Sequence, residues 1–326
     1  MTTPALPTLD DLAAAARLIA PHVPPTPQYR WPLIEARVRG PRAVWLKHEN
    51  HTPAGAFKVR GGLVYLDALK RERPDVEGVV SATRGNHGQS IGFAARRTGH
   101  RVVIVVPHGN SREKNAAMRA LGAELIEDGH DFAESCDVAD RVAAERGYHR
   151  LPSFDLRLVA GVGTYAVELL RAVPDLERLY VPIGLGSGIC GCYAAKEALG
   201  HPVEIVAVVS AHATAMAQSL HEGRAVESVS TTRIADGMAT RRPDATAFAV
   251  LMARRPHVVA VTDDEVEQAM RALFHDTHNV AEGAGAAALA AVIADGEHAA
   301  GRSVAAIVCG GNVDSDVFAR VLTGTA

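Results

Sequence analysis

Residues 55–62, Gly-Ala-Phe-Lys-Val-Arg-Gly-Gly, place one lysine between small residues and an aromatic, just after an expected strand at residues 44–49. A lysine amine is a good nucleophile only when it is neutral, so its pKa must fall below the usual value of about 10.4. Burial in an apolar, glycine-lined pocket lowers that pKa. The setting therefore suits Lys58 to form a Schiff base, although most lysines are simply solvated surface charges.

Two further loops follow apolar strands. Residues 81–89, Ser-Ala-Thr-Arg-Gly-Asn-His-Gly-Gln, come after the apolar residues 78–80 and open a helical run at 90–97. Free N–H groups at such a helix start suit a carboxylate, and the Asn86 amide could hold a cofactor oxygen. Residues 182–189, Pro-Ile-Gly-Leu-Gly-Ser-Gly-Ile, form a second turn between a strand and a helix. Its glycines let backbone N–H groups approach a phosphate closely.

The order of these motifs is more specific than any one of them. Glycines 184, 186 and 188 do not have the G-x-G-x-x-G spacing of dinucleotide sites. A lysine after an early strand is followed by a Gly-Asn-His turn, a glycine-rich turn in mid-chain and Cys-Gly-Gly-Asn at 309–312. This order resembles the serine/threonine dehydratase family of pyridoxal-phosphate enzymes, of the tryptophan-synthase-β fold type, which also includes serine racemases. The resemblance covers nearly the whole chain.

The resemblance implies a role for each residue at a matching position. Lys58 would carry the cofactor as a Schiff base and then act as the base for the α-proton, with Phe57 packed beside the cofactor. Asn86 would bond the phenolic oxygen, and Cys309 would face the pyridine nitrogen. The phosphate would lie on Gly184, Leu185, Gly186, Ser187 and Gly188, a loop in which the leucine interrupts the usual glycines. The substrate side would comprise Thr83, Arg84, Gly85, Asn86, His87, Asp236 and Glu282.

The reaction that the resemblance implies is loss of water from a β-hydroxy-α-amino acid, followed by hydrolysis of the resulting enamine or imine to a 2-oxo acid and ammonia. A thiol at Cys309 is too weak an acid to keep the pyridine nitrogen protonated, which favours prompt loss of the β-substituent over transamination. We expect L-threonine or L-serine as substrate. β-Phenylserine and threo-3-hydroxyaspartate stay open, as do a β-replacement enzyme of the same fold and a non-catalytic protein that binds the cofactor or an amino acid.

Arg84 and Val209 depart from the family pattern, and His275 and His278 raise the question of a metal site. Arg84 stands where serine racemases carry a serine acid/base, so racemisation is not expected. Its planar guanidinium could bind a second carboxylate, as in 3-hydroxyaspartate, or could point to solvent or brace the loop. Val209 stands where metal-binding relatives carry a glutamate, and His275 and His278 lack a third ligand at metal spacing. We therefore expect no metal, and a surface role for histidines such as His257.

Composition limits the partners. The chain has 326 residues, 48% of them hydrophobic, which is enough for two domains or one large one. With 34 basic and 37 acidic residues and a net charge of −3, nothing favours nucleic acid or an anionic membrane. The four cysteines show no metal spacing or disulfide framework, and the N-terminal region lacks the features of a signal peptide. We expect a cytoplasmic protein with a small-molecule substrate and, by analogy with the family, a homodimer.

Short apolar runs that alternate with helical stretches predict an α/β fold with two open, mainly parallel twisted sheets and flanking helices. The expected strands include 102–106, 123–126, 205–209, 258–261 and 304–308. The expected helices include 111–121, 131–146, 263–275 and 282–293, the first three capped by Ser111, Asp131 and Asp263. The resemblance implies pyridoxal-phosphate fold type II, in which a small mobile domain, residues 76–150, is inserted into a large cofactor-binding domain, residues 1–75 and 151–326.

Overall fold

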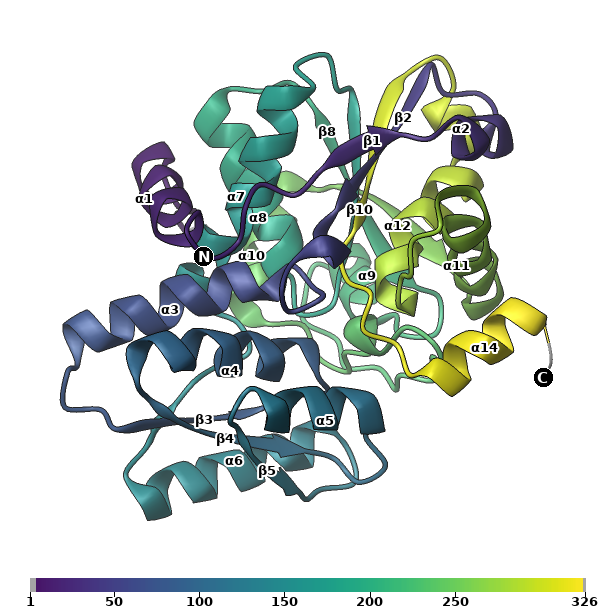
Figure 1. Ribbon diagram of the computed structural model, residues 1–326. Coiled ribbons are helices and arrows are strands. Elements are labelled where there is room, and N and C mark those ends of the chain that lie inside the picture. The colour runs from purple at the N-terminus through teal and green to yellow at the C-terminus, as the bar shows by residue number, and fades with distance from the viewer. Residues whose placement is uncertain (1–3, 325–326) are drawn as a thin grey trace.

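The structure is a computed structural model that describes residues 4–324, and it contains two β-sheets surrounded by helices (Figure 1). The larger sheet consists of β1 (Gln28–Arg30), β2 (Ala43–His48), β7 (Arg178–Pro182), β8 (Glu204–Ser210), β9 (His257–Val261) and β10 (Ser303–Val308). The smaller sheet consists of β3 (Gly78–Ala82), β4 (Arg101–Val106), β5 (Glu124–Glu127) and β6 (His149–Arg150).

Helices occupy most of the chain between these strands. The α-helices are α1 (Leu9–Ile19), α2 (Pro32–Val38), α3 (Lys58–Glu72), α4 (Asn86–Thr98), α5 (Arg112–Ala120), α6 (Phe132–Arg146), α7 (Leu156–Ala172), α8 (Ser187–Leu199), α9 (Ala215–Glu222), α10 (Ala245–Arg254), α11 (Asp263–Thr277), α12 (Gly283–Ala294), α13 (Gly296–Ala299) and α14 (Ser315–Thr323). Two short 3₁₀ helices are η1 (Glu49–His51) and η2 (Asp236–Met238).

Both sheets are built mainly from parallel strands. The larger sheet has the order β1-β2-β10-β7-β8-β9, and its one antiparallel pair joins β1 to β2. The smaller sheet has the order β5-β4-β3-β6 and is parallel throughout. These topologies confirm the predicted α/β fold class. The division into two domains at residues 75/76 and 150/151 stays a prediction, although all four strands of the smaller sheet fall between residues 78 and 150.

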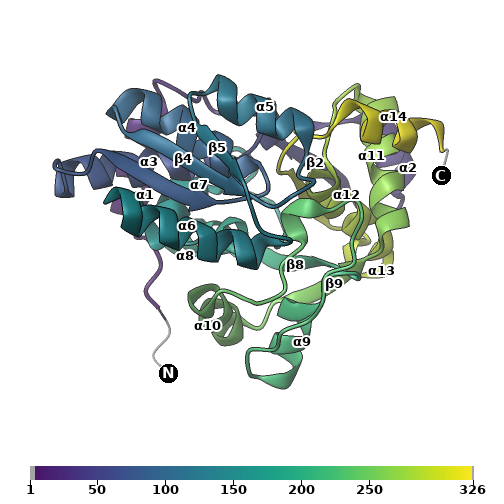
Figure 2. The ribbon, with the colours of Figure 1, turned by 90° about the horizontal axis from the view of Figure 1, so that it is seen from below.

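A layer of helices separates the two sheets. In Figures 1 and 2, α3 and α4 lie between the smaller sheet and the rest of the molecule, while α6 covers the other face of that sheet. Leu63 of α3, Ile91 of α4 and Leu158 of α7 share one buried apolar cluster with Val79 of β3. The burial of this cluster fixes α3, whose first residue is Lys58, against the smaller sheet.

Local capping signals placed two of three helix starts correctly. Ser111 and Asp131 accept backbone N–H groups at the starts of α5 and α6, which confirms both predictions. The predicted cap at Asp263 is wrong, because the cap of α11 is Thr262. Thr262 forms a reciprocal capping box with Glu265, and this leaves Asp263 as the first residue inside the helix.

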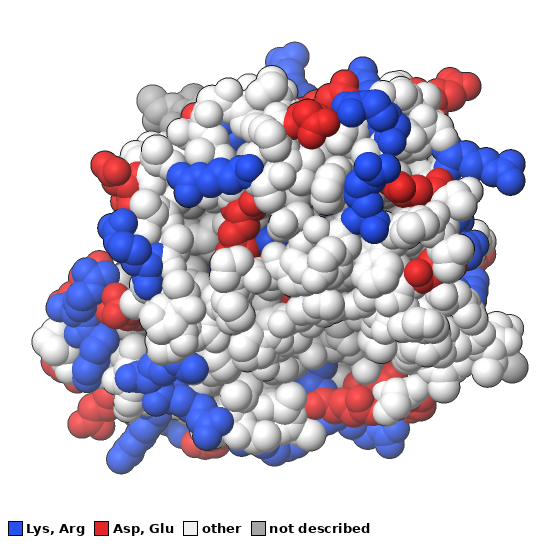
Figure 3. Space-filling view, turned by 45° about the horizontal axis from the view of Figure 1, so that its top comes forward, with Lys and Arg blue, Asp and Glu red and all other residues white. Residues whose placement is uncertain are grey.

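The surface offers no large area of one charge on the face that Figure 3 shows. Basic and acidic side chains are intermixed around a broad region with few charges. Among residues 4–324, no helix is long and apolar enough to span a bilayer. Cys190 and Cys192 are buried in α8, where they pack in the apolar core of the larger sheet.

Candidate active site

The loop that carries Lys58 is joined to the residues that follow β10. Phe57 donates its backbone N–H to the Cys309 carbonyl (3.0 Å), and Gly311 donates to the Gly55 carbonyl (2.8 Å). β10 lies beside β2 in the sheet, so the two strands deliver these loops to the same edge. Lys58 and Cys309 are therefore brought together although they are distant in sequence.

Burial sets the charge state of both residues. Burial lowers the pKa of the Lys58 amine, and the neighbouring Cys309 and Glu282 oppose that shift only in part. The Lys58 Nζ lies 4.8 Å from the centroid of the Phe57 ring. Burial also raises the pKa of the Cys309 thiol far above its ordinary value. The pair therefore presents a nucleophilic amine beside a thiol that stays protonated at neutral pH.

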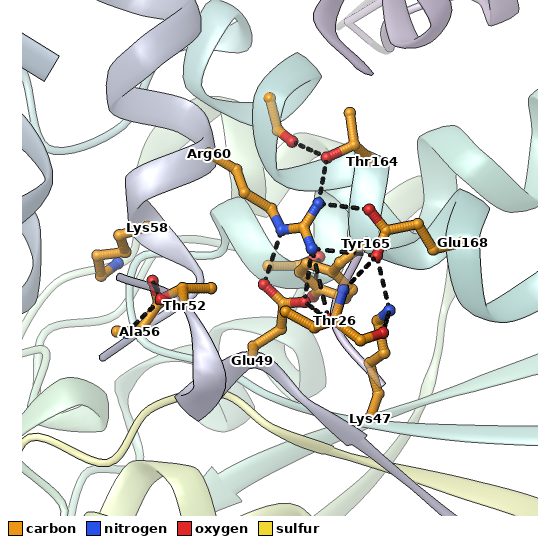
Figure 4. Close-up of polar contacts among 12 residues, drawn as sticks. Thr26, Lys47, Glu49, Thr52, Ala56, Lys58, Arg60, Thr164, Tyr165 and Glu168 are labelled. Atoms are coloured by element: carbon orange, nitrogen blue, oxygen red, sulfur yellow. Dashed lines mark hydrogen bonds and ion pairs between the residues drawn. The ribbon is translucent and has the colours of Figure 1, made fainter. Parts of the chain in front are cut away.

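A buried ionic network holds the start of α3. Arg60 donates to both carboxylate oxygens of Glu49 (2.8 and 3.0 Å) and of Glu168 (2.7 and 3.0 Å). Lys47 Nζ adds a 2.7 Å bond to Glu168. Figure 4 shows Arg60 and Lys58 leaving the start of α3 on different sides, so the network anchors the helix without occupying the space around the Lys58 amine. It ties α3 to the end of β2 and to α7.

The loop between β3 and α4 forms a tight turn at the start of a helix. Gly85 has φ 154°, a conformation that side chains rarely adopt, and its N–H donates to Thr83 Oγ1 (3.0 Å). His87 is buried, and its Nε2 lies 3.2 Å from the Pro152 carbonyl oxygen. Burial above all lowers the pKa of His87, to about 3, so the ring is neutral. The first N–H groups of α4 have no acceptor within the helix, so they are suited to bind a carboxylate.

Asn86 is oriented by side chains from two other segments. Its Nδ2 donates to Glu282 Oε1, and its Oδ1 accepts from Asn312 Nδ2 (2.9 Å). The other oxygen of Glu282 pairs with Lys114 Nζ (2.9 Å). Burial opposes the charge of Lys114, but Glu282 and Asp236 raise its pKa overall. One N–H of the Asn86 amide remains for a ligand, since an amide nitrogen carries two.

The glycine-rich loop between β7 and α8 closes the site from the other side. Gly186 is the N-cap of α8 with φ 106°, and a side-chain Cβ there would lie 2.6 Å from the Cβ of Ala247. Gly184 packs so tightly on the carbonyl of Gly237 that no side chain fits. The helix begins at the buried Ser187, two residues before the expected start near Ile189. Backbone N–H groups at this helix start are of the kind that suit a phosphate.

Two adjoining cavities collect all of the predicted site residues. The outer cavity encloses about 620 Å³, part of it open to solvent, and is lined by Lys58, Thr83, Arg84, Gly85, Asn86, His87, Lys114, Phe132, Ser153, Leu185, Asp236, Gly237, Ala239 and Thr240. The inner cavity has about 390 Å³ of empty space, some of it also open to solvent, and is lined by Phe57, Lys58, Asn86, Pro182, Gly184, Leu185, Gly186, Ser187, Gly188, Gly237, Met238, Glu282, Ala284 and Cys309. The roles of the predicted residues stay predictions, but the structure places every one of them here.

Sequence reasoning missed several residues of the site. Asn312 stands in the 309–312 motif, so its position was a readable signal for a role beside Asn86. Lys114 had none, because it lies in α5 among ordinary surface charges and reaches Glu282 only through the fold. Phe132 and Ser153 follow no motif either, and they enter the outer cavity from the smaller-sheet region.

Arg84 has an exceptional place in the outer cavity. Its Nε is buried and has no hydrogen-bond partner within residues 4–324. No ion pair within this range involves Arg84 either, although thirty others are present. An unsatisfied guanidinium nitrogen costs free energy unless a ligand or water supplies the acceptor.

The arrangement fits a phosphorylated aldehyde cofactor. It combines an amine of lowered pKa, a glycine cradle at a helix N-terminus and a neutral thiol within one inner cavity. A second helix N-terminus opens onto the outer cavity and suits the carboxylate of an amino acid. The donor set therefore suits chemistry at the α-carbon of an amino acid.

Comparison with known proteins agrees with this chemistry. The family model described as "Pyridoxal-phosphate dependent enzyme" matches residues 19–310. The chain is 32% identical to L-threonine ammonia-lyase of Thermotoga maritima over 319 residues, 97% of this chain and 78% of the relative. Its structure resembles a solved T.th. threonine deaminase (TM-score 0.87, 31% identity, 94% of this chain and 99% of that one). It also resembles a pyridoxal 5'-phosphate-dependent aspartate racemase (TM-score 0.90, 27% identity, 96% and 98% covered).

Proposed function

The chain belongs to the pyridoxal-phosphate-dependent enzyme family and is a lyase of that family, and from this premise we propose that it dehydrates L-threonine or L-serine. The products would be a 2-oxo acid and ammonia. The observation that carries the proposal is the position of Lys58, which lines both cavities between the N-termini of α4 and α8. The printed names of the relatives, a threonine ammonia-lyase and a threonine deaminase, support threonine first.

Residues of the inner cavity would hold the cofactor. Lys58 would bind it covalently, and the loop from Gly184 to Gly188 would bind its phosphate at the start of α8. The free N–H of Asn86 would donate to the ring oxygen, and the Cys309 thiol would face the ring nitrogen. When bound, pyridoxal phosphate withdraws electrons from the α-carbon of the amino acid and so weakens its C–H bond.

The chain's own groups would then orient the substrate and move one proton. The N–H groups at the start of α4 would hold the α-carboxylate, and His87 in the same turn stays neutral. Lys58 Nζ, neutral because burial lowers its pKa, would take the α-proton. The β-hydroxyl would leave as water with a proton returned by Lys58 or taken from solvent, and hydrolysis of the released enamine or imine would give the 2-oxo acid and ammonia. Arg84 carries no hydroxyl for a second proton transfer on the opposite face, so we expect elimination and not racemisation.

A specific observation supports threo-3-hydroxyaspartate as a second candidate substrate. The Nε of Arg84 is buried without a partner on the wall of the outer cavity, and a β-carboxylate would supply the missing acceptor. The structurally similar aspartate racemase is named for a dicarboxylic amino acid. The solvent-facing or bracing role for Arg84 is the competing interpretation.

One experiment tests both substrates. Release of 2-oxo acid and ammonia is measured for L- and D-threonine, serine, β-phenylserine and threo-3-hydroxyaspartate, with protein reconstituted with pyridoxal phosphate. Arg84→Ala should lower kcat/KM for 3-hydroxyaspartate roughly ten- to hundredfold, the cost of one charged hydrogen bond, while threonine turnover stays within a few-fold. Equal losses for both substrates would instead support a bracing role.

Lys58→Ala provides the matching control. It should abolish turnover together with the visible absorbance of covalently bound cofactor. Turnover that survives in Lys58→Ala would overturn the proposed chemistry. Bound cofactor with no product from any amino acid would shift the function to β-replacement or to a binding protein.

We further propose that residues 76–150 close over the substrate as a unit and that the chain forms a homodimer in the cytoplasm. Closure is supported by the separate smaller sheet, which carries the carboxylate loop at the end of β3. The dimer and the compartment rest on the family resemblance alone. Small-angle scattering with and without substrate, and light scattering for mass, test the first two proposals.

A further inference from the structure

Three metal-ligating side chains lie together away from the cavities. His257 begins the edge strand β9, Asp295 directly follows α12, and His298 lies in α13. Asp295 Oδ1 is 3.4 Å from His257 Nε2 and 3.1 Å from His298 Nδ1. One ligand atom from each of the three residues can be chosen so that all lie within 4.8 Å of one another. The cluster is at the amino end of β9, whereas the cavities are at the carboxyl ends of the parallel strands.

The carboxylate of Asp295 is held in place by residues behind it. Its second oxygen, Oδ2, accepts hydrogen bonds from Arg178 Nη1 (2.7 Å) and from the Tyr180 hydroxyl (2.7 Å). Asp295 is only 8% exposed, so Oδ1 is fixed toward the two imidazoles. Arg178 in turn forms a bidentate ion pair with Glu204, in which each of the two hydrogen bonds is 2.8 Å long. Such outer hydrogen bonds orient a ligand and raise its metal affinity.

The spacing agrees with ligands that share one ion. Zinc takes imidazole nitrogen and carboxylate oxygen at about 2.0–2.2 Å, which places neighbouring ligand atoms about 3–3.5 Å apart. Both carboxylate–imidazole distances fall at this spacing. The side chains of His257 and His298 are 36% and 64% exposed, so an ion can enter and water can complete its coordination. The negative end of the α12 dipole also points here.

We propose that His257, Asp295 and His298 bind a divalent transition-metal ion of the zinc, cobalt or nickel class. Two imidazoles select this class over magnesium or calcium, which take oxygen ligands. The ion would tie the edge strand β9 to the end of α12 and to α13. It touches no residue of either cavity, so its role is to stabilise the fold and not to take part in catalysis. The proposal departs from our expectation of no metal, which rested on Val209 and on the pair His275 and His278.

Titration with cobalt(II) and zinc(II) tests the site directly. Untagged holoenzyme is freed of unbound cofactor and titrated by calorimetry, and cobalt is also followed by its visible absorption. We expect one equivalent per chain, and a rise of a few degrees in the unfolding temperature at about 100-fold excess over Kd. His298→Ala should weaken binding more than about tenfold and abolish the temperature rise.

The exposed members of the site can be replaced without disturbing the fold. The exposed ligands are His257 and His298. The variants His298→Ala and His257→Gln leave the hydrogen bonds of Asp295 to Arg178 and Tyr180 in place. His275→Ala, an exposed histidine of α11, is the matched control and should bind as the unaltered chain does. Absence of a stoichiometric site, or equal binding by His298→Ala and His257→Gln and the unaltered chain, would overturn the proposal. The outcome is independent of the proposed function, because Lys58→Ala should bind the metal unchanged.

Discussion

Arg60 and Glu49 form an ion pair from which solvent is excluded, with side-chain exposures of 1% and 0%. A buried charge that loses its partner is strongly destabilising, because it cannot return to water. We expect Glu49→Gln to lower the free energy of unfolding by about 3 kcal/mol, at the lower end of the usual range because Glu168 still pairs with Arg60. Unfolding in urea, followed by circular dichroism, measures this loss.

The same helix supplies a control for that prediction. Arg71 pairs with Asp67 on α3, but their side chains are 71% and 35% exposed. Arg71→Ala should therefore change the free energy of unfolding by less than about 1 kcal/mol. If the losses for Glu49→Gln and Arg71→Ala were equal, the buried network would not anchor α3 as we infer.

His87 makes stability depend on pH. Its pKa is about 3 in the folded chain, against 6.5 as its ordinary value, mainly because it is buried. Below pH 6.5 the unfolded chain takes up a proton that the folded chain does not, so stability falls as the pH drops toward 3. The titration of His87 changes the free energy of unfolding by at most ~1.4 kcal/mol per pH unit. His87→Gln should flatten the fall in urea-unfolding free energy between about pH 6 and pH 4, whereas the exposed His221→Gln should leave it steep.

Lys114 and Glu282 should behave as a coupled pair. Their side chains are 9% and 5% exposed, so Lys114→Met leaves a carboxylate without its cation beside Asn86. We expect a loss of about 3 kcal/mol in unfolding free energy for Lys114→Met. The double variant Lys114→Met/Glu282→Gln should lose clearly less than the sum of the single variants, because the unpaired charge is removed. Additive losses in this double-mutant cycle would show that the two groups do not stabilise each other.

Gly186 and Gly200 offer a matched comparison of two glycines with positive φ. They lie at opposite ends of α8, with φ 106° and 60°. A side chain at 186 would collide with Ala247, whereas the space around 200 is open. Gly186→Ala should therefore weaken pyridoxal phosphate binding at least tenfold in equilibrium dialysis. Gly200→Ala should cost only about 1 kcal/mol of stability and leave the Kd unchanged.

Much of the site could be predicted because its signals are local. Parallel strands bring their carboxyl ends to one edge of a sheet, so the loops after β2, β7 and β10 meet at one edge of the larger sheet, and the loop after β3 approaches them from the smaller sheet. The predicted residues of these loops do lie around the two cavities. What they bind stays a prediction.

The remaining features depend on contacts between distant segments. Lys114 reaches Glu282 across 168 positions of sequence, and no pattern around either residue marks the pair. The cluster of His257, Asp295 and His298 brings together the start of β9, the end of α12 and the single-turn helix α13. The sequence led us to expect His257 only at the surface. By contrast, the error at Asp263 was avoidable, because Thr262 and Glu265 have the spacing of a capping box.

The place of β10 between β2 and β7 sets the order in which this enzyme can mature. During synthesis the lysine loop and the glycine cradle leave the ribosome long before residues 303–312, which join them. Until then, the facing edges of β2 and β7 have no partner strand and can pair with other chains. A nascent chain that stalls before β10 would therefore lack the cofactor site and be prone to aggregation, so chaperones should matter most until β10 has been synthesised and has joined the sheet.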